Sequence, residues 1–139
     1  MINLSMIFII GVILSNGQSS NGNGAGDFIS FGLEEGFPVF KFNLGSGPAV
    51  IKATQPVKTG QWHSVTLNRN EKNGNMIVDG LGPFVGVAPG RHQGLDLAAP
   101  LYLGGVPDFN KIHKLAGFTT GFVGKLQTTS YGCRTSSFT

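Results

Sequence analysis

Glycine and proline divide this chain into short apolar runs, and that punctuation limits the folds it can adopt. The 139 residues include 22 glycines and 7 prolines, which follow no triplet period. They stand between runs rich in Phe, Ile, Val and Leu, as expected when short strands are joined by tight turns. No stretch carries a sustained helical apolar period, so we expect little or no helix. The pattern predicts an all-β fold.

Composition excludes several other classes of protein. Hydrophobic residues make up 40% of the chain and charged residues 12%, which is not the composition of a disordered segment. The length suits a single domain with a buried core. The net charge of +3 includes no dense run of Lys or Arg, so we expect no nucleic-acid partner. No apolar stretch is long enough to span a bilayer as a helix.

Several segments have the apolar pattern and flanking turns of strands. They are 27–33, 37–44, 49–53, 60–69, 76–78, 101–103 and a last one starting at 118–123. Asn73-Gly74 is a hairpin-tip signal between two of them. Residues 81–94 are rich in Gly and Pro and are predicted to form a long loop.

The order of these segments resembles the laminin G-like domain, especially the copies in perlecan- and agrin-type basement-membrane proteoglycans. The motifs that carry the resemblance are DFISFGL at 27–33, FKFNLGSGPAVI at 40–51, GQWHSVTLNR at 60–69, MIVDG at 76–80 and LDLAAPLYLGG at 95–105. The resemblance implies a laminin G-like jelly-roll (concanavalin-like) β-sandwich of two antiparallel sheets. It covers 11–124, which leaves 1–10 as a signal-like segment or residual terminal strand and 125–139 as a divergent tail.

Both ends of the chain depart from the family pattern, so we expect a domain truncated at both ends. Lys125 stands where the family has a cysteine, and Cys133 has no partner for an internal disulfide. The apolar stretch 6–14 is interpreted either as a signal-peptide core or as a buried strand. No Lys or Arg precedes it, which favours the strand.

The resemblance also implies a metal site, because the family holds one calcium ion at a rim of the sandwich. When the family's ligand positions are transferred to this sequence, the ligands are the side chains of Asp27 and Asp96 and the backbone carbonyls of Leu44 and Gly94. Carboxylate and carbonyl oxygens are the donors that calcium prefers. The alternative is that both aspartates only cap loop turns, which Asp does without a metal.

Basic residues near this rim are the second candidate site. Arg91 and His92 lie in the segment leading to Asp96, and we expect them to contact sulfate or carboxylate groups of an acidic glycan. The other basic residues are interpreted mainly as a solvated surface. His63, in Gln61-Trp62-His63, is interpreted as a hydrogen-bonded strand residue, beside Trp62 as a structural anchor.

The function implied by the resemblance is that of a secreted, extracellular (basement-membrane) binding module. Its partners would be acidic glycans, heparan sulfate, glycosylated receptors such as dystroglycan, or other matrix proteins, recognised with the help of calcium. A metal-free structural or self-association module is the alternative. The chain has no G-x-S-x-G, HExxH, C-x-x-C or P-loop motif, so we expect no enzyme. A glycan-processing activity is disfavoured because no carboxylate pair shares a strand face.

Overall fold

The computed structural model describes residues 2–8, 11–17, 27–58, 60–91, 94, 102–103, 117, 124–128 and 137–138, with side chains from 27–58, 60–91, 94 and 117. All regular structure in these residues is β, which confirms the predicted fold class. Within the same residues, no helix has the length and apolarity to cross a membrane.

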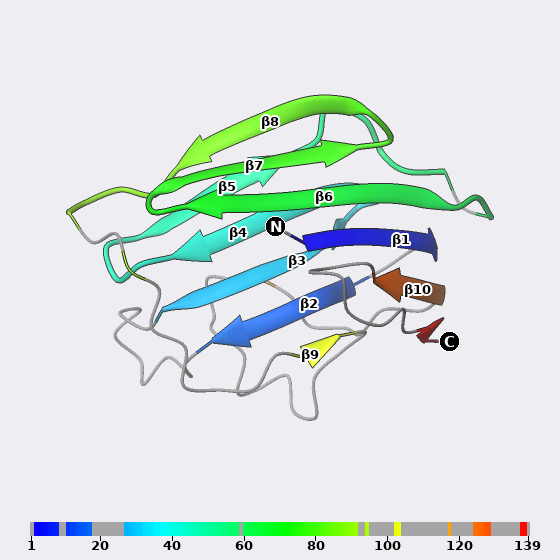
Figure 1. Ribbon diagram of the computed structural model, residues 1–139, viewed down its shortest axis with the longest axis horizontal. Coiled ribbons are helices and arrows are strands. Elements are labelled where there is room, and N and C mark those ends of the chain that lie inside the picture. The colour runs from blue at the N-terminus through cyan, green and yellow to red at the C-terminus, as the bar shows by residue number, and fades with distance from the viewer. Residues whose placement is uncertain are drawn as a thin grey trace.

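The strands follow one another along the chain with short turns at several hairpins (Figure 1). They are β1 (Ile2–Phe8), β2 (Gly11–Gly17), β3 (Phe28–Glu34), β4 (Phe37–Asn43), β5 (Pro48–Lys52), β6 (His63–Asn70), β7 (Asn73–Val78), β8 (Leu81–Val87), β9 (Tyr102–Leu103), β10 (Gly124–Thr128) and β11 (Ser137–Phe138).

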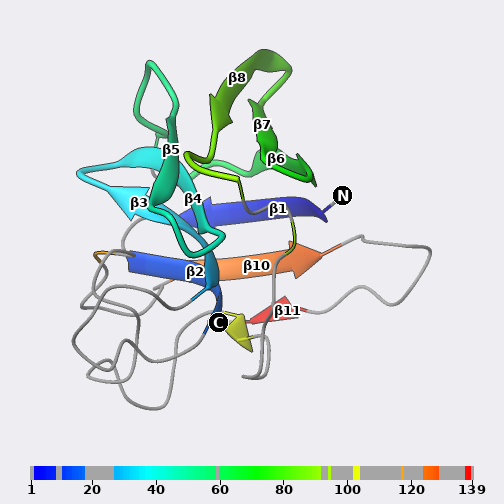
Figure 2. The ribbon, with the colours of Figure 1, turned by 90° about the vertical axis from the view of Figure 1, so that its left-hand side faces the viewer.

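The strands form two antiparallel sheets, as predicted. One has six strands in the order β11-β10-β1-β6-β7-β8, and the other has five in the order β5-β4-β3-β2-β9. β5 and β8 end their respective sheets on the same side of the molecule, in the upper part of Figure 2. β1 and all of β10 except Gly124 fall outside the 11–124 interval, and these two strands pair with each other, while β1 also pairs with β6.

Alternation along the strands puts one side-chain set from each sheet into a common core. The buried cluster contains Phe31, Leu33, Phe40, Phe42, Leu44, Ala49, Ile51 and Ala53 from the five-stranded sheet and its loops, and Val65, Leu67, Met76, Val78 and Ala88 from the six-stranded sheet and its continuation. Phe40 and Phe42 are adjacent, with ring centroids 5.5 Å apart. The core therefore depends on the β3–β4–β5 segment, where the aromatic residues concentrate.

Two sequence predictions about turns are wrong. The β6–β7 hairpin turns at Glu71-Lys72, where Glu71 has a positive φ of 55°, while Asn73-Gly74 belongs to β7. Gly74 is buried, and a Cβ there would lie 3.0 Å from Ile51 Cδ1 and closer still to the Phe42 ring. The glycine read as a turn signal is required by packing.

The predicted loop 81–94 is also incorrect over its first half, because Leu81–Val87 forms β8. Pro83 cannot donate a backbone hydrogen bond, but β8 has a neighbour on one side only, and edge strands tolerate proline. Gly86 meets β5 closely, since a Cβ there would lie 2.7 Å from Ile51 Cγ1. Trp62, expected to anchor the fold, is half exposed.

We predict that Gly74→Ala destabilises the domain by about 1–3 kcal/mol, because the added methyl overpacks the core against Phe42. Urea unfolding measures the loss. The double variant Gly74→Ala, Phe42→Leu should recover part of it, since the smaller side chain makes room for the methyl. Strictly additive losses in the double variant would contradict this account.

Candidate calcium and glycan rim

Pairing between β3 and β4 brings the first two predicted calcium donors to the same rim. Phe28, at the start of β3, pairs with Asn43, at the end of β4. Asp27 precedes the first residue of that pair and Leu44 follows the second, so antiparallel register places them opposite each other. This rim is the left-hand end of the sandwich in Figure 1.

The turn after Leu44 is held by a side chain from the end of β4. Asn43 is fully buried, and its Oδ1 accepts hydrogen bonds from the backbone N–H of Gly45 at 2.8 Å and of Gly47 at 3.1 Å. Asparagine commonly orders turns in this way. The backbone that would present the Leu44 carbonyl is therefore ordered by the chain itself.

The segment 88–91 closes on the same rim. The Ala88 N–H donates to the Lys72 carbonyl at 2.8 Å, which ties this segment to the β6–β7 hairpin. A Cβ on Gly90 would lie 2.5 Å from Ser46 Cβ, so Gly90 packs directly against the turn after Leu44. Exposed Arg91 follows at once. The structure thus brings Asp27, the Leu44 turn and Arg91 to one end of the sandwich.

The remaining predicted residues divide into two groups. Gly94 is described and exposed, whereas Asp96 and His92 lie outside the described residues. In the described part of the chain, no group of three or more His, Cys, Asp or Glu side chains is gathered as a metal cluster. The predicted ligand set uses only two carboxylates and relies otherwise on backbone carbonyls, which suits calcium.

Beyond Arg91 and His92, the sequence did not indicate which basic residues would lie at the rim. Lys72 is brought there by the bond between its carbonyl and Ala88, and Arg69 lies in the same hairpin, 6.0 Å from the centroid of the Phe42 ring. Lys41 is buried and paired with Glu34, and Lys52 lies over the Phe37 ring. Neither Lys41 nor Lys52 belongs to the rim, and only strand register separates these groups.

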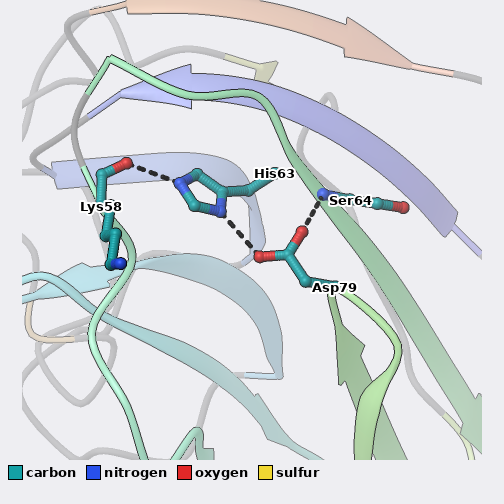
Figure 3. A network of polar contacts seen from close by, with 4 residues as sticks. All are labelled: Lys58, His63, Ser64 and Asp79. Atoms are coloured by element: carbon teal, nitrogen blue, oxygen red, sulfur yellow. Dashed lines mark hydrogen bonds and ion pairs between the residues drawn. The ribbon is translucent and has the colours of Figure 1, made fainter.

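A second polar centre lies at the opposite end of the sandwich, around His63 (Figure 3). His63 is buried, with Nδ1 2.7 Å from Asp79 Oδ2 and Nε2 2.6 Å from the Lys58 carbonyl. The other Asp79 oxygen accepts from the Ser64 N–H at 2.9 Å. These contacts join the 53–58 segment, β6 and the β7–β8 turn around a cavity of about 230 Å³.

Comparison with known proteins identifies the family. The family model described as "Laminin G domain" matches residues 10–134, most of the chain. The basement membrane-specific heparan sulfate proteoglycan core protein of Mus musculus is 48% identical over 118 residues. That match covers 82% of this chain and 3% of the relative. The chain belongs to the laminin G domain family.

Other relatives agree with this assignment. Pikachurin of Rattus norvegicus is 37% identical over 117 residues, which cover 84% of this chain and 11% of pikachurin. Domains LG4-5 of the mouse laminin alpha1 chain superpose with a TM-score of 0.70 at 24% identity, covering 97% of this chain and 36% of that one. The latter likeness supports the sandwich fold alone. This laminin G domain spans only a small part of the two proteins it matches in sequence.

In this laminin G domain, both ring nitrogens of His63 face oxygen acceptors. A carbonyl oxygen can only accept, and an ionised carboxylate can only accept, so the arrangement favours the imidazolium, which donates from both nitrogens. Burial by itself lowers the pKa of His63. The hydrogen bonds to Asp79 and to the Lys58 carbonyl, with the charge of Asp79, outweigh burial and raise that pKa above its usual 6.5.

We predict that the folded domain loses stability as the pH rises. A pKa raised by folding contributes stability that is complete below the ordinary value of 6.5 and is lost as the pH passes through the folded pKa. Asp79→Asn should lower the His63 pKa and flatten the dependence of the unfolding free energy on pH above that value. NMR titration of the imidazole and urea unfolding at several pH values measure the two effects.

Glu71→Gln is the matched control, because it removes a carboxylate at the far end of β6 from His63. It should leave both the His63 pKa and the pH dependence unchanged. A His63 pKa that stays the same in Asp79→Asn would show that the contact does not govern the protonation of the ring.

Proposed function

We propose that this chain is an extracellular-matrix binding module that recognises acidic glycans, or glycosylated receptors and matrix proteins, at the rim formed by Asp27, Leu44 and Arg91, with the help of one calcium ion. The observation that carries the proposal is the β3–β4 register, which places Asp27 opposite Leu44. Relatives in a basement-membrane heparan sulfate proteoglycan and in pikachurin support an extracellular, secreted setting.

The donors at the rim suit calcium. The Asp27 carboxylate and the Leu44 carbonyl are hard oxygen ligands, and the carbonyl of exposed Gly94 and the carboxylate of Asp96 complete the proposed set. When bound, the ion would neutralise the two carboxylates and leave coordination positions open for an oxygen of an acidic sugar. The ordered turn after Leu44 reduces the conformational cost of forming such a site.

Basic side chains around this rim would provide the attraction for sulfate or carboxylate groups. Arg91 is exposed and is adjacent to Gly90, which packs on the turn after Leu44. His92 follows it in sequence, and Lys72 lies in the hairpin bonded to Ala88. A guanidinium group can bind sulfate or carboxylate through two hydrogen bonds, which makes Arg91 the main candidate contact.

The hydrogen bonds of buried His63 favour a binding function over catalysis. Both nitrogens of His63 already engage the Asp79 carboxylate and the Lys58 carbonyl, so the ring offers no open lone pair to act as a general base. The contacts link loops and strands of the domain. They give His63 the structural role expected from the sequence.

We predict that calcium binds the purified domain at a single site and that Asp27→Ala, Asp96→Ala weakens binding at least about ten-fold, because both side-chain ligands are lost. Isothermal titration calorimetry measures the number of sites and the calcium dissociation constant. Glu35→Gln is the control, since Glu35 is an exposed acid at the opposite end of the β3–β4 hairpin. No calcium binding by a chain that melts cooperatively would favour the metal-free structural module.

We further predict that Arg91→Gln weakens binding of a heparin oligosaccharide in the presence of calcium, with the largest loss at low salt, because a charged contact is removed. Lys58→Gln, an exposed cation at the His63 end, is the control and should bind as the parent chain does. Calorimetry with the same oligosaccharide measures both. Equal losses in the two variants would indicate nonspecific attraction to a basic protein.

A further inference from the structure

Exposed apolar side chains gather on one side of the domain. The large hydrophobic residues with high exposure in the described part of the chain are Val50 (53%), Trp62 (50%), Leu81 (55%), Val85 (72%) and Val87 (60%). Three of these five lie on β8 and one on β5, the strands that end the two sheets on the same side. Exposed apolar residues that cluster in this way mark interaction surfaces.

From Phe84 to Val87, the residues of β8 alternate between a partly buried and an exposed position. Phe84 packs against the core and pairs with buried Met76, while Val85 and Val87 pair with Asn75 and Asn73. Both valines therefore lie on the outer face of the six-stranded sheet, with no described layer above them. Gly86, between them, lies close to Ile51 of β5 on the inner face of the sheet.

β8 lacks the protection that edge strands usually carry. It is the last strand of its sheet, so one row of its backbone N–H and C=O groups has no neighbouring strand in the sheet. Natural edges are commonly guarded by charged side chains, but neither β7 nor β8 contains one. The guards of β8 are Pro83 and the irregular register opposite Met76–Val78, and both lie in the first half of the strand, before Val85.

We propose that β8 is a self-association edge, which pairs antiparallel with β8 of a second copy of this chain about a two-fold axis near Gly86. Val85 of each copy then lies opposite Val87 of the other on the outer face. The two six-stranded sheets become continuous across the axis. Pro83 falls toward the outside of the overlap, where its missing N–H matters least.

A second copy fits this edge better than a charged partner does. The chain carries a net charge of +3, so two copies repel each other wherever their basic residues meet. The strands β7 and β8 contain no charged residue, so a contact made through the β8 edge avoids that repulsion. An antiparallel strand edge is also self-complementary, and a two-fold interface needs only one surface that matches itself. A single strand edge buries less than a standard interface, so the dimer is weak.

This proposal is independent of the calcium rim, because β8 contributes none of the proposed ligands. Sedimentation velocity of the whole chain in EDTA, over a concentration series from about 1 to 500 μM, tests it directly. We expect a reversible monomer–dimer equilibrium. Val85→Lys and, separately, Val87→Lys should weaken dimerisation at least about ten-fold, because ammonium groups of the two copies would meet near the axis.

Asn68→Lys is the matched control, since it adds the same charge on an exposed position of the same sheet face in β6, away from the edge. Circular dichroism and a cooperative melt check that each variant is folded. Amide hydrogen exchange gives a second readout: protection at 84–87 should rise with concentration in the parent chain and not in Val85→Lys.

Dimerisation that Val85→Lys and Val87→Lys weaken and Asn68→Lys preserves supports the edge. A parent chain that stays monomeric throughout the series overturns it. So does association that both valine variants retain, or that Asn68→Lys loses equally, because the contact would then lie elsewhere or involve the whole sheet face. Growth beyond the dimer without saturation excludes a closed two-fold pair.

Discussion

The seven residue pairs between β3 and β4 hold together both the core and the proposed binding rim. In this register Phe31 pairs with Phe40, and both rings enter the core. A slip of one residue would move the aromatic set of one strand to the other face of the sheet. The same slip would separate Asp27 from Leu44. The most apolar part of the fold therefore also sets the position of its most polar candidate site.

Both faces of this hairpin are buried, which has a cost. On the face away from the aromatic core, Ser30 Oγ and Asn43 Nδ2 are buried and have no hydrogen-bond partner among the described residues, and a group left unsatisfied costs about 1–3 kcal/mol. Asn43 also orders the turn after Leu44 through its Oδ1. The hydrogen bonds that order this turn explain why an asparagine occupies a buried position. Lys41 is accommodated on the same face by pairing with Glu34.

The ends and the open side of the sandwich differ in chemistry. At one end, Asp27, the turn after Leu44 and Arg91 lie at a common rim. At the other, Asp79 and the Lys58 carbonyl satisfy the His63 ring, so that polar centre is closed within the protein. Between the two ends, β8 presents valines and an unpaired backbone edge. Calcium-assisted recognition and self-association would therefore use separate surfaces, and one chain could perform both.

The sequence by itself determined the all-β class, most strands and the family, because turn residues and apolar alternation are local signals. It pointed to Asp27 and Leu44 through resemblance, and to Arg91 through its place in the segment leading to Asp96. Their placement at one rim came from the β3–β4 register and from the packing of Gly90 against the turn after Leu44. Only the tertiary structure showed the roles of residues whose local sequence signals were misleading. Gly74 serves the packing of Phe42 rather than a turn, and Pro83 lies in a strand because β8 is an edge. It also decided that Lys41 is buried while Lys72 reaches the rim, since burial and proximity depend on neighbours distant in sequence.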